Sequence, residues 1–540
     1  MIKQRRHQTP NDSRFGLRWQ TKGKEREHHD KLVRKHSFPR CCRGIAVLLL
    51  LLLAISCDFR PWILTETLRE DLYTKKFIQS NTWNLKKKKS PGDSKLPDPV
   101  PLLHQEPFVQ QEATASFPIA TEALMRRHEC IFHIRERQFA TYTSLLGKRS
   151  SPFRSMILLV DPAYHANVGD HMITAAEHIF LRRLGWDADT NAGKNNKNIN
   201  PNAEFQECHY LQANEFVPHC DTLLHSQNPL HGQGKVAVWH GGGNWGDLWP
   251  QMQKIRLEQS FRALLQSNYS SVVGMPQSLY YQHPESEIAD ARLLKRALRL
   301  GVTAREGSFN FTSKVVLSWR EYDSYHKAKR LYPYLTNVVV PDIAFQLGPY
   351  KPIRPAATHE HDFLFLLRRD HESTLLLDVF SNMDDTKNDD DEDGRVFPTD
   401  PNTIPRLLED AVSSAMKVAR THGKTYSYRI VDWPDRWDMF DSDDPYFSDT
   451  SIQLLSLGRV VICDRLHAAI LAFLTGLSFV YLDQITGKIS KSLKLAFDSW
   501  DGCREKERSN NPKRTARSLK YAQAANLTDA IDEAVNLLQF

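Results

Sequence analysis

The fold of this chain is constrained most by a repeated alternation of short apolar runs with longer segments of helical spacing. The runs have the length of buried strands, as at 156–160, 236–239 and 478–482. Short strands that are apolar on both faces and separated by helices form parallel sheets with helices on both sides. The alternation begins at residue 155 and begins a second time at His361. We therefore predict an α/β protein with two doubly wound lobes that face a cleft.

The same pattern sets the expected domain boundaries. The first lobe is predicted at 123–350 and the second at 351–505, followed by a C-terminal helix at 506–540. Within the first lobe, residues 301–304 form a short apolar run after a helix and are predicted as a strand. An acidic stretch at 383–394 interrupts the second lobe. Without the ordered ligand spacing of a calcium loop, such a stretch is typical of a solvated insertion.

The N-terminal tail differs in charge from the rest of the chain. Residues 1–43 contain 13 Lys and Arg against 4 Asp and Glu, whereas the remainder contains 58 against 60. Because the positive charge is not spread over a folded domain, nucleic-acid binding loses its main support. A leucine-rich run follows, and we predict a transmembrane signal anchor at 44–64 and a Pro- and Lys-rich stem at 65–122. A cleaved signal peptide is the alternative.

A basic tail before an anchor predicts a single-pass type II membrane protein. Its body would lie in the lumen of the Golgi or of another endomembrane compartment. Sequons at Asn268, Asn310 and Asn526 fit a glycoprotein of that lumen. The body holds five cysteines, an odd number that leaves at least one thiol free, and Cys208 with Cys220 is the favoured pair.

The segment 460–470 carries the strongest indication of chemistry. Its apolar run ends at Asp464, and Arg465 and His467 then precede an apolar helix. The first turn of a helix attracts anions, because its unpaired N–H groups and the helix dipole both favour negative charge. A guanidinium and an imidazole at that turn indicate a small polyanionic ligand and a proton that must be moved.

Polar residues also follow the predicted strands of the first lobe. Asn167, Gly169 and Asp170 suit a turn and a helix N-cap. The glycine-rich segment 239–249 allows close backbone approach to a ligand, and its tryptophans suggest a platform for a sugar ring, although a packed turn is the alternative. Arg305 ends the predicted strand at 301–304, where a surface ion pair with Glu306 is the competing interpretation.

Taken in order, these motifs resemble those of the polysaccharide pyruvyl transferase family over about residues 155–500. The matching segments are 167–170, 240–247, 276–278, 304–306, 341–342 and 464–469. With its predicted anchor, the chain is more similar to the fungal galactose pyruvyltransferase type than to the soluble bacterial members. The resemblance implies two Rossmann-like lobes of the GT-B kind. It also implies transfer of pyruvate from phosphoenolpyruvate to a sugar, such as a galactoside on a glycan, as a cyclic ketal.

The resemblance also implies roles for individual residues. The expected catalytic residues are Arg305, Arg465 and His467. The expected donor-binding residues are Arg305, Arg465, Leu466, His467, Asn167, Gly169 and Asp170. The expected acceptor-binding residues are His240, Asn244, Trp245, Asp247 and Gln277. The family's first motif often continues with Glu, where this chain has His171.

The implied chemistry agrees with these residue types. Phosphoenolpyruvate carries a phosphate and a carboxylate, so two forked guanidinium groups can hold both ends. His467 is the candidate acid for C3 of the donor, and His240 or Asp247 is expected to orient or deprotonate an acceptor hydroxyl. No metal or other cofactor is expected, and the membrane is a partner only through one N-terminal helix.

Two other functions remain open at this point. A nucleotide-sugar glycosyltransferase of the same two-lobed fold would need a residue that reads the ribose hydroxyls, and the segment after His467 offers no obvious one. A non-catalytic glycan-binding secretory protein would be favoured by loss of the Arg and His residues from the motifs, but both are present.

Overall fold

A computed structural model describes the chain from residue 118 to residue 539. The residues left undescribed within this range are 147–155, 164–166, 187–203, 209–234, 258–260, 262–263, 265–268, 304–314, 351–358, 371, 377–402, 420–422, 434–446, 502 and 504–519. The described residues belong to one compact unit, Glu112–Phe540. The predicted tail and anchor, residues 65–117 of the predicted stem, the acidic stretch and Arg305 lie outside the described residues. Residues 118–122, predicted as the end of the stem, instead belong to a helix that begins at Pro118.

The first lobe is built on a parallel sheet. Its strands pair in the order β2-β1-β3-β5-β7-β6-β4, and β8 pairs with β7. Their bounds are β1 Met156–Val160, β2 Glu204–Cys208, β3 Lys235–Trp239, β4 Gly242–Gly246, β5 Ser271–Gly274, β6 Gln277–Tyr280, β7 Val315–Trp319 and β8 Thr336–Val339. All five residues of β1 and of β7 are buried, as expected for strands covered on both faces.

The second lobe contains a smaller parallel sheet, with strands in the order β10-β9-β11-β12-β13. Their bounds are β9 His361–Leu366, β10 Tyr428–Val431, β11 Gly458–Cys463, β12 Ser478–Leu482 and β13 Tyr521–Ala524. The two sheets confirm the prediction of an α/β protein with parallel sheets in two lobes.

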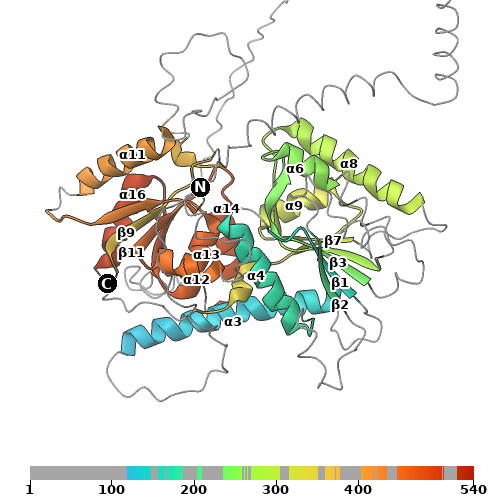
Figure 1. Ribbon diagram of the computed structural model, residues 1–540, viewed down its shortest axis with the longest axis horizontal. Coiled ribbons are helices and arrows are strands. Elements are labelled where there is room, and N and C mark those ends of the chain that lie inside the picture. The colour runs from blue at the N-terminus through green and yellow to red at the C-terminus, as the bar shows by residue number, and fades with distance from the viewer. Residues whose placement is uncertain are drawn as a thin grey trace, which may run out of the picture. The chain divides into compact units, whose positions relative to one another are not determined.

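Helices cover both faces of each sheet, and α4 (Val168–Arg183) lies between the two lobes (Figure 1). It contacts α12 (Phe447–Leu455) and α13 (Leu466–Thr475) of the second lobe. One apolar cluster therefore runs from Val238 of the first sheet through α4 to Val461 of the second. The outer faces are covered by helices including α6 Pro250–Ile255, α8 Pro284–Thr303, α9 Tyr322–Leu331, α11 Thr403–Ala419 and α16 Leu527–Leu538.

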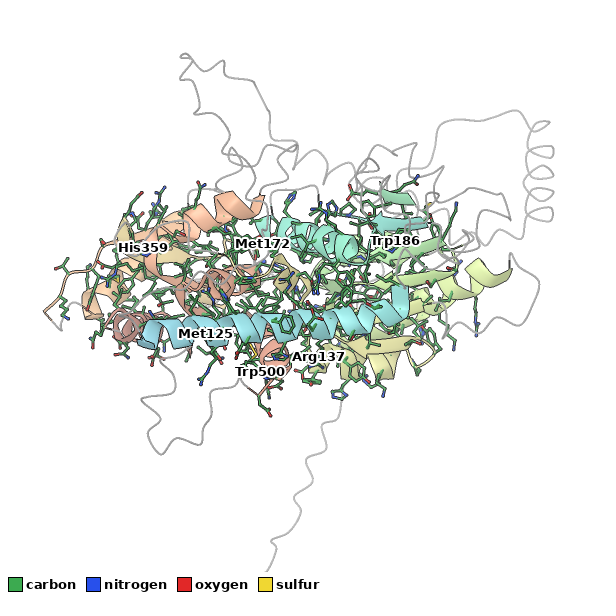
Figure 2. All side chains as sticks on the ribbon, turned by 90° about the horizontal axis from the view of Figure 1, so that it is seen from below. Met125, Arg137, Met172, Trp186, His359 and Trp500 are labelled. Carbon is green, nitrogen blue, oxygen red and sulfur yellow. A yellow bond between two sulfur atoms is a disulfide. The ribbon has the colours of Figure 1, made fainter. Side chains whose placement is uncertain are left out.

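The long helix α3 (Pro118–Leu146) ties the lobes together (Figure 2). Its Cys130 forms a disulfide with Cys503, 373 residues further along the chain. His133 stacks on Trp500 with ring centroids 4.6 Å apart. The Gln138 amide donates to the carbonyl of Asp342 at 2.6 Å, just before the 3₁₀ helix η4 (Ile343–Leu347). The N-terminal helix thus braces the second lobe and the last strand end of the first lobe together.

Two predicted elements of secondary structure are wrong. Residues 301–303 continue α8 and do not form a strand, because the preceding Leu- and Arg-rich run favours helix up to Thr303. The strand of this region is β7, whose Val-Val-Leu-Ser-Trp sequence suits a buried strand. Near the C-terminus, a strand interrupts the predicted helix: β13 pairs with β12 before α16 begins. Sheet pairing outweighs the helical propensity of its two alanines.

The cysteine prediction is confirmed in one respect. Cys463 is a buried free thiol, and Cys208 takes part in a disulfide whose partner lies outside the described residues. The favoured partner, Cys220, is not among the described residues. In the part of the chain that the structure describes, no helix has the length and apolarity needed to span a membrane.

Candidate active site

Polar side chains follow the strands of both sheets where the two lobes meet. In the first lobe, His240 follows β3 and Arg320 follows β7. In the second lobe, Arg368 comes two residues after β9, and Asp464 follows β11. Because the carboxyl ends of parallel strands meet at one edge of a sheet, this arrangement matches the prediction that polar strand ends converge.

Arg320 and His467 approach one carboxylate from opposite lobes. Asp342 Oδ2 lies 2.6 Å from Arg320 Nη1 and 3.4 Å from His467 Nε2. Its other oxygen accepts a hydrogen bond from Ala344 N at the start of η4. Although burial raises the pKa of Asp342, His467 and Arg320 lower it more strongly, to well below its ordinary range. Asp342 is therefore an ionised carboxylate that joins the two lobes.

Arg320 still has hydrogen-bonding capacity after these contacts. Its Nε donates to Ser278 Oγ at 2.7 Å, and Nη2 has no acceptor among the described residues. A Cβ placed on Gly243 would lie 2.9 Å from Nη2 and 3.5 Å from Lys488 Nζ. A side chain at this position would therefore touch two cationic groups, one from each lobe, and the glycine leaves both uncovered on that side.

Arg465 and His467 stand at the start of α13, as predicted. Arg465 is the N-cap residue, and it donates from Nε and Nη2 to both oxygens of Asp432, at 2.6 and 2.8 Å. This bidentate pair leaves Nη1 as the guanidinium nitrogen without an acceptor in the described part of the chain. His467 packs against Gly169, where any Cβ would collide with its Nδ1. The first turns of α4 and α13 are thus in contact.

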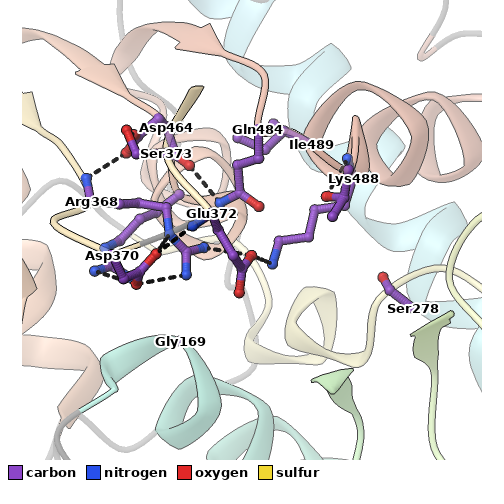
Figure 3. A network of polar contacts seen from close by, with 12 residues as sticks. Gly169, Ser278, Arg368, Asp370, Glu372, Ser373, Asp464, Gln484, Lys488 and Ile489 are labelled. Carbon is purple, nitrogen blue, oxygen red and sulfur yellow. Dashed lines mark hydrogen bonds and ion pairs between the residues drawn. The ribbon is translucent and has the colours of Figure 1, made fainter. Parts of the chain in front are cut away.

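A dense ionic network braces the second-lobe side of this contact (Figure 3). Arg368 donates from Nε and Nη2 to Asp370, at 2.8 and 2.9 Å, and its Nη1 lies 3.0 Å from Glu372. Glu372 also pairs with Lys488 at the start of α14 (Lys488–Phe497). Burial favours a raised pKa for Asp370, but Arg368 and then Arg465 lower it to below its ordinary range.

Asp464 is hydrogen-bonded to two residues of the segment that carries this network. Its two carboxylate oxygens accept hydrogen bonds from Arg368 N at 2.7 Å and from Ser373 Oγ at 3.0 Å. Its backbone carbonyl accepts from Gln484 Nε2 at 2.6 Å. Burial raises the pKa of Asp464 to about 6, and this outweighs the opposing effect of the two arginines.

Two of the predicted acceptor-binding residues, His240 and Gln277, lie on the first-lobe side of the site. Together with Arg320 they define what we call the first-lobe wall. His240 is buried, and its Nδ1 lies 2.8 Å from Glu177 on α4. The Gln277 amide donates to the carbonyl of His240, which leaves Gln277 Oε1 and His240 Nε2 buried and without a hydrogen-bond partner in the described residues. A buried polar atom without a partner is costly, so these two atoms are suited to a polar ligand.

The structure corrects the expectation for Trp245. Its indole is buried among Trp239, Trp319 and Tyr332, with the Trp319 ring 5.6 Å away, and it cannot serve as a platform for a sugar ring. The side chain points inward because residues 242–246 form strand β4 instead of an open loop. The side chain of the neighbouring Asn244 lies outside the described ones.

Three other predicted residues have local structural contacts. Asp247 accepts hydrogen bonds from the backbone N–H groups of Gln282 and His283, at 2.7 and 2.8 Å, and so holds the turn before α8. Asn167 is the N-cap of α4, and its amide donates to Asp170 at 2.9 Å. The Leu466 side chain is part of the apolar core, which leaves only its backbone for a ligand.

Arg320 is the principal residue that the sequence-based prediction missed. Two Arg-Glu dipeptides lie between the glycine-rich segment 239–249 and Asp342, at 305–306 and 320–321, and the prediction selected the first. The second directly follows the β-branched run of β7 and precedes a helix, which is the context expected of a strand-end ligand. In the described residues, no group of three or more His, Cys, Asp or Glu side chains could hold a metal ion.

Comparison with known proteins identifies the family. The sequence model for polysaccharide pyruvyl transferases matches residues 167–484, more than half of the chain. The chain therefore belongs to the polysaccharide pyruvyl transferase family. The predicted family is confirmed, and with it, at the level of the family, the predicted class of enzyme. The match contains the site residues from Asn167 to Gln484.

Individual relatives support this assignment. Pyruvyl transferase 1 of Schizosaccharomyces pombe is 26% identical over 339 residues, which are 60% of this chain and 66% of that protein. The putative pyruvyl transferase EpsO of Bacillus subtilis is 27% identical over 144 residues, 26% of this chain and 37% of that protein. The aligned region thus spans less than two thirds of either relative. A solved structure of an uncharacterized Klebsiella pneumoniae protein aligns with a TM-score of 0.33 and 14% identity over 67% of this chain and 93% of that one.

Proposed function

We propose that this protein transfers pyruvate from phosphoenolpyruvate to two hydroxyl groups of a sugar and forms a cyclic ketal. The observation that carries the proposal is the set of buried cationic groups at the lobe junction within a chain of this family. Arg320 Nη2 and Arg465 Nη1 keep hydrogen-bonding capacity, and Lys488 Nζ lies, like Arg320 Nη2, close to the position that a Cβ on Gly243 would take. A phosphate and a carboxylate on one small molecule match several cations better than a single anionic group would.

The proposed reaction balances without a further reactant. One sugar hydroxyl attacks C2 of the donor, C3 gains a proton and becomes a methyl group, and the C2–O bond to phosphate breaks. The second hydroxyl then completes the ketal at C2. Of the two hydroxyl protons, one is accounted for by the methyl group and the other by the released phosphate. His467 is our candidate for the proton donor, since it lies at the lobe junction against Asp342.

For the acceptor we propose a galactoside on a glycan. The first-lobe wall supports a hydroxyl-rich ligand, because His240 Nε2 and Gln277 Oε1 are buried there without partners among the described residues. The sheet edge to which they belong also carries Arg320, whose backbone N–H donates to the carbonyl of Gln277 at 3.0 Å. Donor and acceptor would therefore share one wall.

We also propose that the reaction takes place in the Golgi lumen, with the chain anchored by residues 44–64. The support is the charge difference between residues 1–43 and the rest of the chain, followed by the leucine-rich run. Protease protection of the C-terminal body in intact microsomes, together with resistance to alkaline extraction, is the expected result. Digestion of the body without detergent would contradict this localisation.

The activity is tested with purified full-length protein, phosphoenolpyruvate and a panel of nitrophenyl glycosides. We expect release of inorganic phosphate and a product with the added mass of a pyruvate ketal. His467→Gln should abolish turnover, whereas His359→Gln should not, since Nδ1 of that half-buried histidine donates to the backbone carbonyl of Ser456 and contacts none of the site residues named above. Consumption of nucleotide sugars instead would indicate a glycosyltransferase, and glycan binding without turnover on any donor would indicate a binding protein.

A further inference from the structure

A buried carboxylate lies directly behind the imidazole of His240. Glu177 is completely buried on α4, and its Oε2 lies 2.8 Å from His240 Nδ1. Its Oε1 accepts a hydrogen bond of 2.8 Å from the backbone N–H of Gly241. Both oxygens are therefore held by consecutive residues at the end of β3. Neither the family's motifs nor the expected site residues include this glutamate.

This contact determines which ring nitrogen carries the proton. A carboxylate has only lone pairs to offer, so Nδ1 must be the N–H donor to Glu177. In the neutral imidazole, Nε2 is then the nitrogen with the free lone pair. It is buried and has no hydrogen-bond partner among the residues described. The ring therefore presents a basic nitrogen that the folded protein itself does not use.

The charged groups around His240 raise the pKa of its imidazole. Burial lowers its pKa, but the charge and hydrogen bond of Glu177, followed by the charges of Asp170 and Asp161, raise it by more. The cation in this group is Arg256, which is buried near the same two aspartates and lies over the Trp239 ring at 5.8 Å. The acidic groups of Asp161, directly after β1, and of α4 thus dominate the environment of the ring.

The imidazole also belongs to the wall that holds the donor-binding groups. The carbonyl of His240 accepts from Gln277, whose own carbonyl accepts from Arg320 N at 3.0 Å. Gly243, three residues after His240, is the glycine whose missing side chain leaves Arg320 and Lys488 uncovered. Two hydrogen bonds and a three-residue segment therefore connect His240 to the proposed phosphate and carboxylate site.

We propose that Glu177 is a positioning residue that fixes the tautomer of His240, so that Nε2 accepts the proton of the attacking acceptor hydroxyl. The inference rests on the proposed function. In this step the hydroxyl O–H bond breaks, its proton moves to Nε2, and its oxygen bonds to C2 of the donor. The C2=C3 double bond opens as C3 takes a proton from His467. The C2–O bond to phosphate then breaks, the second hydroxyl oxygen takes the vacated position at C2, and its proton leaves with the phosphate. A carboxylate behind the ring stabilises the imidazolium that forms.

Glu177→Gln tests the proposal through the pH dependence of kcat/KM. Loss of the negative charge lowers the pKa of His240. The acidic limb of the pH profile, where kcat/KM falls because the base becomes protonated, should therefore move to lower pH by about one unit. At the plateau, kcat should fall by at least about tenfold with little change in the KM for the acceptor. Glu207→Gln is the matched control, because Glu207 pairs with His178 on α4 away from the site and should leave the limb in place. Reduced activity with an unmoved acidic limb would show that Glu177 only supports the structure.

A second measurement does not depend on turnover. In protein labelled with ¹⁵N-histidine, the signal that disappears in His240→Gln belongs to His240, and it should show a protonated Nδ1 and an unprotonated Nε2. Glu177→Asp keeps a carboxylate and should retain this tautomer if the Gln variant fails to fold. A protonated Nε2 in the neutral ring of the wild-type protein would overturn the proposal. If the wild-type protein shows the expected tautomer but no turnover on phosphoenolpyruvate, the proposed function is refuted instead. The role of Nε2 as the base in pyruvyl transfer is then refuted with it.

Discussion

Arg320 of the first lobe and Arg368 of the second lobe are both buried arginines at strand ends, but they differ in how their donors are used. All three nitrogens of Arg368 contact the carboxylates of Asp370 and Glu372. Arg320 uses two nitrogens on Ser278 and Asp342 and keeps Nη2 without an acceptor in the described residues. A guanidinium with every donor occupied acts as a brace, whereas one with spare donors can recognise a ligand.

The same difference holds for the neighbours of each arginine. Around Arg368, Glu372 pairs with Lys488, and Asp464 is hydrogen-bonded at both oxygens. Around Arg320, two buried atoms, His240 Nε2 and Gln277 Oε1, have no partner among the described residues. Ion pairs are therefore concentrated around Arg368, although Gln484 Oε1 beside Asp464 is also buried without a partner among the described residues. The unpaired atoms beside Arg320 show where a polar ligand is expected.

The largest expected effect is a loss of stability in Arg368→Met. This change leaves the half-buried Asp370 and the buried Glu372 with less compensation, which should lower the free energy of unfolding by about 3–5 kcal/mol. Arg330→Met is the control, since Arg330 pairs with Glu287 at 2.8 Å on the surface and should cost less than about 1 kcal/mol. Chemical denaturation measures both. Equal losses of unfolding free energy in the two variants would mean that the ionic network around Arg368 does not stabilise the second lobe.

Arg320→Lys should mainly reduce catalysis. Lysine keeps the positive charge but cannot contact Ser278, Asp342 and a donor anion with one fork. We expect kcat/KM for phosphoenolpyruvate to fall by about 10²- to 10³-fold. Arg305→Lys should change it by less than about threefold if Arg320 is the donor-binding arginine. Steady-state kinetics of both variants decides which of the two Arg-Glu dipeptides carries the function, and a larger loss in Arg305→Lys would restore the original assignment.

A Gly→Ala substitution in each lobe should show that one glycine matters for donor binding and the other for stability. In Gly243→Ala, the new Cβ would lie 2.9 Å from Arg320 Nη2, the end of a flexible side chain. We expect the KM for phosphoenolpyruvate to rise about tenfold, with little change in melting temperature. In Gly458→Ala, the Cβ would lie 2.7 Å from the backbone nitrogen of Leu364 on β9, so stability should fall by about 1–3 kcal/mol. Thermal melts and donor titrations of both variants test this. A loss of stability in Gly243→Ala together with a raised KM in Gly458→Ala would contradict the comparison.

The smallest expected effect is a change in the pH dependence of stability in Asp464→Asn. The folded pKa of Asp464 is raised to about 6, so between pH 4 and 6, roughly, the native state binds more protons than the unfolded state at this residue. Its contribution to stability therefore decreases as pH rises through this range. Asparagine can keep both hydrogen bonds and removes the titration, so the variant should gain about 1 kcal/mol relative to wild type at pH 7 compared with pH 5. An unchanged pH profile in denaturant melts would be inconsistent with the raised pKa.

Strongly patterned elements could be predicted from the sequence. The bounds of β1 and β12 agree with the prediction residue for residue, and the start of α13 after Asp464 places Arg465 and His467 as expected. These segments are almost entirely apolar, so local pattern and burial favour the same structure. The strand predicted at 301–304 failed because a run of four residues carries too little pattern to separate a strand from the end of a helix.

By itself, the sequence determined the two parallel α/β lobes, the ordered motifs of the family and the polar strand ends, because these depend on local pattern and residue order. Only the tertiary structure decided that Arg320 meets Asp342 and His467, that Trp245 packs inward, and that Glu177 lies behind His240. Glu177 and His240 are 63 residues apart, and Cys130 and Cys503 are 373 apart. Such contacts follow from the packing of α4 and α3 against both lobes, which no local pattern of residues encodes.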